Sequence, residues 1–123
     1  MRVLIVEDDE VDASHMTRIL RRVVPEASIL FAKTLEDAAV QVVRDQPDVM
    51  ILDLTLPPAT AFDTLKLMNS YIKVIPTLVV TGHADAEAAL QAIEEGALGF
   101  LLKSKLDTML PKMFTEVVET GRT

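Results

Sequence analysis

Residues 49–57 decide much of what this chain can fold into. Large apolar side chains precede a single carboxylate, Asp53. Two further apolar residues, Leu54 and Leu56, lie between Asp53 and Pro57. Such an apolar run is typical of a strand that is buried on both faces, as strands of parallel sheets are. The carboxylate then lies at the carboxyl end of the strand, which is where open α/β sheets bind ligands. Taken alone, Asp53 is also compatible with an ordinary turn or helix cap.

Four more short apolar segments are predicted to be strands, and a helical pattern follows each of the five. The further strands are expected at 3–6, 28–31, 77–80 and 97–102. The spacing of apolar residues predicts helices that begin near Val11, Thr34, Phe62, Asp85 and Asp107. The start of the last helix is left open between Asp107 and Leu110. Pro111 is placed in its first turn, where a missing N–H costs little.

Five strands that alternate with helices imply right-handed crossovers and a parallel sheet with helices on both faces. The predicted fold class is α/β, a doubly wound, flavodoxin-like sheet of five parallel strands in the order 2-1-3-4-5. The chain has 123 residues, which is the size of one domain. We therefore expect a single domain over residues 1–123, without an effector domain.

Composition narrows the classes of function. The chain has no Cys, so a bound metal must use oxygen or imidazole ligands. A net charge of −7 argues against direct binding to nucleic acid. The apolar runs are too short to span a membrane, and the N-terminal segment is unlike a signal peptide. We expect a soluble, cytoplasmic protein that does not bind membranes.

The predicted strand order gathers polar residues at one edge of the sheet. The first strand is followed by Asp8 and Asp9, while the third, fourth and fifth end in Asp53, Thr81 and Lys103. Carboxylates held close together need a positive charge to offset their repulsion. Mg²⁺ suits this role because it prefers oxygen ligands. Asp53 is then a candidate nucleophile that forms an aspartyl-phosphate, with Mg²⁺, Lys103 and the Thr81 hydroxyl each binding one phosphoryl oxygen. In isolation, Asp8 and Asp9 also fit a helix cap.

Through these residues the whole chain resembles the response-regulator receiver domains of two-component signalling, the CheY-like family. The matching segments are 4–9 (Leu-Ile-Val-Glu-Asp-Asp), 51–57 (Ile-Leu-Asp-Leu-Thr-Leu-Pro), 79–82 (Val-Val-Thr-Gly) and 100–103 (Phe-Leu-Leu-Lys). Any one of these segments is weak evidence. Their occurrence together, in the order of the family, is highly specific.

The resemblance implies that Asp53 accepts a phosphoryl group from a sensor histidine kinase or a histidine phosphotransfer protein. It also implies that Asp9, Asp53 and the backbone carbonyl of Thr55 bind Mg²⁺, with Asp8 acting mainly through water. On this interpretation the chain is a phosphoryl acceptor and not a turnover enzyme. Self-catalysed phosphorylation and dephosphorylation are left open.

Thr81 and Phe100 match the switch pair of the family, in which the hydroxyl moves to the phosphoryl group and the aromatic ring turns inward. The resemblance implies that a partner then recognises the face formed by the fourth helix, the fifth strand and the fifth helix. The downstream partner or effector domain is not identified by the sequence. A homodimer formed through the last helix is left open.

Three residues depart from the family pattern. Ser104 stands where the family usually has Pro, which puts the usual cis peptide in doubt because non-proline cis bonds are costly. Ala61 replaces a common Gly, and Phe100 lacks the hydroxyl of Tyr. These departures motivate an alternative hypothesis, a receiver-like module that binds its partner without phosphorylation. A Mg²⁺-dependent phosphatase of the haloacid dehalogenase type is disfavoured because Thr55 stands where that family expects an acid.

The two histidines lack a second ligand at metal spacing. His15 is interpreted as a residue of the first helix surface. His83 lies two residues after Thr81, so it either borders the site and shields the phosphoryl bond from water or is a plain loop residue.

Overall fold

The computed structural model describes residues 1–121, in which five parallel strands form one sheet in the order β2-β1-β3-β4-β5. The strands are β1 (Arg2–Val6), β2 (Ser28–Ala32), β3 (Val49–Asp53), β4 (Thr77–Thr81) and β5 (Gly99–Leu102). All four neighbouring pairs are parallel. The predicted fold class and strand order are therefore confirmed.

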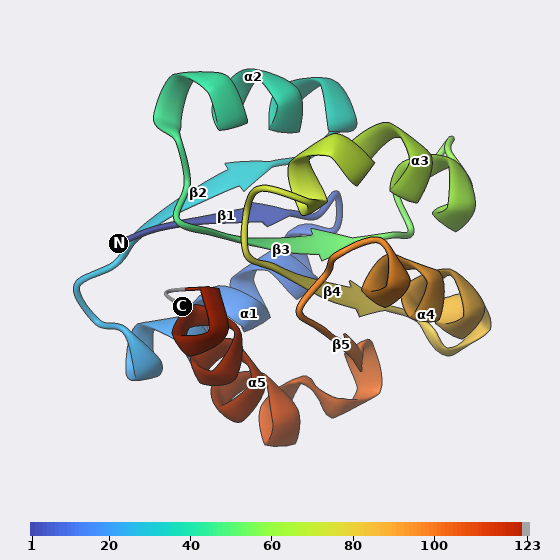
Figure 1. Ribbon diagram of the computed structural model, residues 1–123. Coiled ribbons are helices and arrows are strands. Elements are labelled where there is room, and N and C mark those ends of the chain that lie inside the picture. Colours follow the sequence, from blue (N-terminus) through green and yellow to red (C-terminus); the bar gives the residue numbers. More distant parts are fainter. Residues whose placement is uncertain (122–123) are drawn as a thin grey trace.

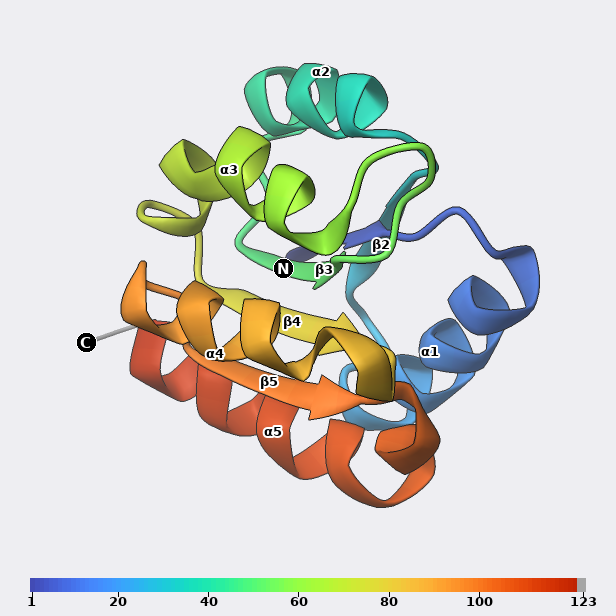
Figure 2. The same ribbon diagram turned by 90° about the vertical axis from the view of Figure 1, so that its right-hand side faces the viewer.

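Helices cover both faces of the sheet (Figure 1 and Figure 2). They are α1 (Glu10–Val23), α2 (Leu35–Asp45), α3 (Ala61–Ile72), α4 (Ala86–Glu94) and α5 (Leu106–Gly121). Short 3-10 turns, η1 (His83–Asp85) and η2 (Lys103–Lys105), precede α4 and α5. Residues of α1 and α5 share one core cluster, and residues of α2, α3 and α4 share the other. No helix within residues 1–121 is long and apolar enough to cross a membrane.

Alternation along each central strand supplies side chains to both cores. In β1, Val3 and Ile5 belong to the cluster under α1 and α5, whereas Leu4 and Val6 belong to the cluster under α2, α3 and α4. Successive side chains of a strand point to opposite faces, so a strand covered on both faces must be apolar throughout. This requirement explains why Asp53 is the only polar residue of β3.

The beginning of α5 differs from the prediction. The helix starts at Leu106, directly after η2, so Pro111 is its sixth residue and lies in the second turn. The prediction that Pro111 belongs to the first turn is therefore wrong. Because proline has no N–H, the carbonyl of Asp107 receives no helical hydrogen bond from it. Tertiary packing of α5, which buries Leu106, Leu110 and Phe114, outweighs this local loss.

The buried aromatic residue of α5 gives a test of this packing. Phe114 is fully buried, so Phe114→Ala should lower the free energy of unfolding by about 3–5 kcal/mol through lost burial and a cavity. Phe62→Ala makes the same chemical change at a residue that is 49% exposed, and we expect an effect within about 0.5 kcal/mol. Urea unfolding of the two variants measures both values, and equal losses would contradict the assignment of the core.

Candidate functional site

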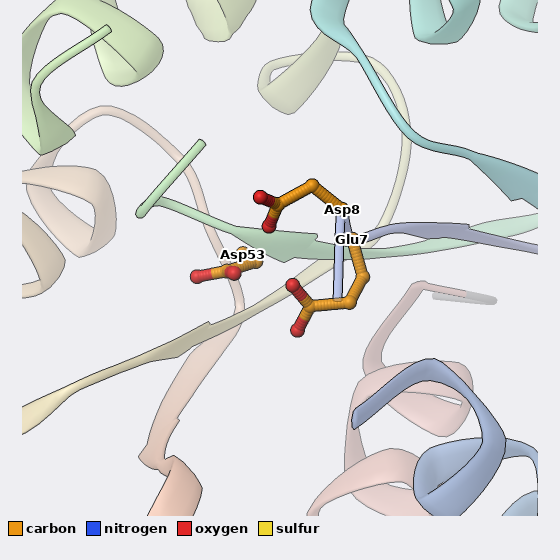
Figure 3. Close-up of side chains that lie close together, drawn as sticks. All are labelled: Glu7, Asp8 and Asp53. Atoms are coloured by element: carbon orange, nitrogen blue, oxygen red, sulfur yellow. The ribbon is translucent and has the colours of Figure 1, made fainter. Parts of the chain in front are cut away.

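Three carboxylates meet beyond the ends of two neighbouring strands. Glu7 and Asp8 follow β1, Asp53 ends β3, and one oxygen atom of each lies within 4.8 Å of the others. Figure 3 shows the three side chains directed into the same region. Glu7 and Asp53 are buried, whereas Asp8 is exposed. The cluster therefore reaches solvent at Asp8.

Asp9 does not belong to this cluster, although it was predicted to bind the metal together with Asp53. Asp9 is the N-cap of α1, and its Oδ1 accepts hydrogen bonds from the backbone N–H groups of Val11 at 2.8 Å and Asp12 at 3.1 Å. The alternative interpretation of Asp9 as a helix cap is the one that the structure supports. Because β1 ends at Val6, Glu7 is the first residue beyond the strand and takes the place that was expected for Asp9.

Lys103 brings a positive charge to the carboxylates from the end of β5. Its Nζ lies 2.9 Å from Glu7 Oε1, 3.0 Å from Asp53 Oδ2 and 2.8 Å from Asp12 Oδ2. The position of Lys103 beside Asp53 follows from the predicted strand order. Asp12, in the first turn of α1, was not predicted to take part.

Burial and charge change the proton affinities of these groups. Burial, reinforced by the adjacent Asp53 carboxylate, raises the pKa of Glu7 from 4.5 to about 8, although Lys103 opposes the change. Burial alone would lower the pKa of Lys103, but the three adjacent carboxylates of Asp12, Glu7 and Asp53 together raise it above its ordinary value. In the absence of a cation, Glu7 therefore carries a proton near neutral pH while Lys103 stays charged.

Two threonines border Asp53. Thr81 lies on the strand beside it, one residue beyond Val80, which pairs with Asp53. Its hydroxyl is buried and has no hydrogen-bond partner within residues 1–121, which is unusual for a buried polar atom. The N–H of Thr55 donates to Asp53 Oδ1 at 2.9 Å, and its Oγ1 donates to Asp85 Oδ2 at 2.7 Å. The backbone of Thr55 is thus folded back onto the Asp53 carboxylate.

The expected switch aromatic, Phe100, lies on β5, the strand next to that of Thr81, and pairs with Val79. Phe100 is partly buried and packs against the core cluster of α2, α3 and α4. Ser104, which stands in place of the family's Pro, is joined to Lys103 by a trans peptide bond. The only cis bond in the described part of the chain joins Pro57 to Pro58.

The histidines differ in their surroundings. His15 of α1 is partly buried, and its Nε2 lies 2.6 Å from Asp107 Oδ1 at the start of α5. It therefore links two helices, a contact that its interpretation as a surface residue did not include. His83 begins η1 and is exposed.

The donor set suits a small divalent cation. All three clustered side chains offer carboxylate oxygens, which hard cations prefer. Two buried atoms, Glu7 Oε1 and Asp53 Oδ2, lie close to Lys103 Nζ but have no hydrogen-bond partner within the described residues. Their unused capacity fits a cation bound between the three side chains.

Comparison with protein families gives a match over nearly the whole chain. A family model described as the response regulator receiver domain matches residues 3–114. The C4-dicarboxylate transport transcriptional regulatory protein DctD of Pseudomonas aeruginosa is 30% identical over 105 residues, which are 83% of this chain and 22% of that protein. The transcriptional regulatory protein LnrK of Bacillus subtilis is 24% identical over 94% of this chain and 53% of its own length. The chain thus spans only about a fifth to a half of these curated relatives.

Solved structures of receiver domains have the same fold. The signal receiver domain of a DNA-binding response regulator (merR) from Colwellia psychrerythraea aligns with a TM-score of 0.79 and 27% identity, over 97% of this chain and 98% of that one. The response regulator domain of Thermotoga maritima CheB also aligns with a TM-score of 0.79, over 100% of this chain and 97% of that one. Its identity is 21%, so this likeness concerns the fold alone.

The raised pKa of Glu7 has a consequence for stability. The folded protein binds the Glu7 proton more tightly than the unfolded chain does, so this residue makes stability fall as the pH rises from about 4.5 to about 8. We expect urea unfolding in the presence of a chelator to show this decrease for the wild type. Glu7→Gln cannot ionise, so its stability should depend less on pH over the same range. Equal pH dependence of the two proteins would contradict the assignment.

Proposed function

The chain belongs to the response regulator receiver domain family, and from this membership we propose that Asp53 accepts a phosphoryl group. The donor that we propose is a sensor histidine kinase or a histidine phosphotransfer protein. The observation that carries the proposal is the surrounding of Asp53, which combines two further carboxylates, a lysine ammonium at 3.0 Å and a neighbouring strand that ends in a buried, unpartnered hydroxyl.

The proposed reaction is an in-line transfer to a carboxylate oxygen. An Asp53 oxygen forms a bond to phosphorus while the bond from phosphorus to the donor histidine nitrogen breaks, and the electron pair remains on that nitrogen. Glu7, Asp8, Asp53 and the carbonyl of Thr55 would hold Mg²⁺, which neutralises part of the phosphoryl charge when bound.

The protein side chains stabilise the remaining charge. Lys103 Nζ donates to one phosphoryl oxygen, and Thr81 Oγ1 donates to another, which satisfies its unused hydrogen-bonding capacity. Such preorganised donors need little rearrangement at the moment of transfer.

The phosphoryl group would shift the protein between two conformations. It adds about −1.5 to −2 charge units at neutral pH. A nearly complete change from a rare to a dominant conformation needs about 5.5 kcal/mol of differential stabilisation. Hydrogen bonds to charged groups contribute about 1.5–3 kcal/mol each. The bonds from Lys103 and Thr81 would therefore supply a large part of this differential stabilisation. Burial of Phe100 and binding of a partner would supply the rest.

The proposed output is recognition of the face formed by α4, β5 and α5. Leu90 and Ile93 of α4 and Met109 of α5 are exposed although they are apolar. We propose a protein partner or effector domain for this face, or a second copy of the chain, and no direct contact with nucleic acid or membrane.

Two alternative functions give different results in simple assays. A module that works without phosphorylation would bind its partner equally well with and without beryllofluoride and Mg²⁺. A turnover phosphatase would hydrolyse a small phosphate ester steadily. We propose neither, because the acceptor, its charge partner and the acidic cluster are all present, and Thr55 replaces the second acid that the phosphatase requires.

The metal ligands can be identified by neighbouring substitutions. Asp8→Asn should weaken Mg²⁺ binding about tenfold or more, the range reported for changes at or next to metal ligands. Asp9→Asn removes the same charge one residue later but keeps a good helix cap, and should bind Mg²⁺ nearly as the wild type does. Titration calorimetry compares the two, and a larger loss for Asp9→Asn would show that Asp9 is the ligand.

The phosphoryl acceptor can be identified by mass. Incubation with acetyl phosphate and Mg²⁺ should add one phosphoryl group to the wild type and none to Asp53→Asn, because an amide cannot form the acyl phosphate. Asp63→Asn changes an exposed carboxylate in the first turn of α3 and should be labelled like the wild type. Intact-protein mass spectrometry measures all three, and labelling of Asp53→Asn would refute the assignment.

A further inference from the structure

Lys103 makes its best-aligned contact with a carboxylate that lies outside the acidic cluster. Its Nζ donates a hydrogen bond to Asp12 Oδ2 at 2.8 Å. The oxygen atoms of Glu7 and Asp53 are nearly as close, at 2.9 and 3.0 Å, but have no hydrogen-bond partner within residues 1–121. One N–H of the ammonium is therefore directed toward α1.

Asp12 is held in place by the cap of α1. Its backbone N–H donates to Asp9 Oδ1 at 3.1 Å, and this bond fixes the first turn of the helix. The Asp12 side chain is 31% exposed, whereas the side chains of Glu7 and Asp53 are fully buried. Asp12 thus pairs with Lys103 from a separate element and from the solvent side of the site.

A lysine ammonium has only three N–H donors. In this protein three carboxylates lie within 3.0 Å of Nζ. When Asp53 becomes an acyl phosphate, its carboxylate charge is lost and the new charge resides on the phosphoryl oxygens. The ammonium must then turn a donor toward a phosphoryl oxygen. Asp12 already holds one of the three donors through its hydrogen bond and Glu7 lies 2.9 Å away, so the phosphoryl oxygens compete with these carboxylates for the ammonium.

We propose that Asp12 is a positioning residue that restrains Lys103 in the unphosphorylated protein, so that the phosphoryl group must compete with Asp12 for the ammonium. The inference rests on the proposed phosphoryl transfer to Asp53. It predicts that loss of the Asp12 charge favours the phosphorylated state. A residue with a merely structural role would have the opposite effect, because its loss would disturb the site and weaken binding.

Beryllofluoride, which mimics the phosphoryl group on Asp53, provides the test at saturating Mg²⁺. Asp12→Asn should bind it about two- to fivefold more tightly than the wild type, which is the range expected for a partly exposed ion pair. Asp12→Glu keeps the charge and should restore binding close to that of the wild type. Glu10→Gln removes a charge from the same turn, where Glu10 pairs with the exposed Lys33, and should have no such effect.

A double-mutant cycle with Lys103→Met separates positioning from general repulsion. If Asp12 acts through Lys103, Asp12→Asn should change beryllofluoride affinity little in the Lys103→Met background. An equal gain in both backgrounds would mean that Asp12 only repels the ligand through space, and would overturn the proposal. Unchanged or weaker binding by Asp12→Asn alone would also overturn it.

A measurement without beryllofluoride keeps this inference distinct from the proposed function. The ¹⁵N–¹H signal of the Lys103 ammonium should be protected from exchange in the wild type and Glu10→Gln, and should broaden or disappear in Asp12→Asn. Protection without any beryllofluoride binding by the wild type would refute the proposed function but not the restraint on Lys103. An unprotected signal in the wild type would refute the restraint itself.

Discussion

The charge balance around Asp53 is the interaction on which the site depends. Glu7 and Asp53 are buried at the ends of two neighbouring strands, and Lys103 is the cation within reach of both. Transfer of an ion from water to a protein interior costs on the order of several kcal/mol unless it is paired. One lysine cannot neutralise both carboxylates together with Asp8 and Asp12. The raised pKa of Glu7 shows the remaining conflict, because a proton supplies the charge that Lys103 cannot. Such a site gains from a bound divalent cation, which would replace that proton.

The fold explains why these residues meet although they are distant in the chain. Parallel strands end at the same edge of the sheet, and the order β2-β1-β3-β4-β5 makes β1 and β3 neighbours. The crossovers that produce this order require helices on both faces, and these helices require central strands that are apolar on both faces. Polar residues are therefore confined to the positions where the strands end. The same constraint that builds the core also concentrates Glu7, Asp53, Thr81 and Lys103 in one place.

The site residues that follow from the hydrophobic pattern could be predicted from the sequence. Those that depend on the backbone path of a few residues could not. Asp53, Thr81 and Lys103 each follow directly after an apolar run, so their positions at strand ends could be predicted. Four consecutive acids follow β1, and nothing in their composition shows at which residue the chain turns into α1. That turn assigns Glu7 to the cluster and Asp9 to the helix cap.

The contact of Asp12 with Lys103 could not be predicted from the sequence for a different reason. Its contact with Lys103 joins residues 91 positions apart. The contact depends on how α1 is rotated about its axis relative to the end of β5, and hydrophobic periodicity defines only the buried face of a helix. Pro111 was misplaced for a similar reason, because η2 leads directly into α5 and moves the start of the helix toward the site.

Two short 3-10 turns, η1 and η2, connect the site at Asp53 to the helices of a distant surface. Thr81 ends β4, and the chain continues through η1 into α4; Lys103 begins η2, which continues into α5. The Thr55 hydroxyl bond to Asp85 ties the end of η1 to the loop after β3. Under the proposed function, the two side chains that interact with the phosphoryl group therefore lie just before the two helices that flank β5. A small displacement at the site would then be transmitted along these helices, because packed elements move as units.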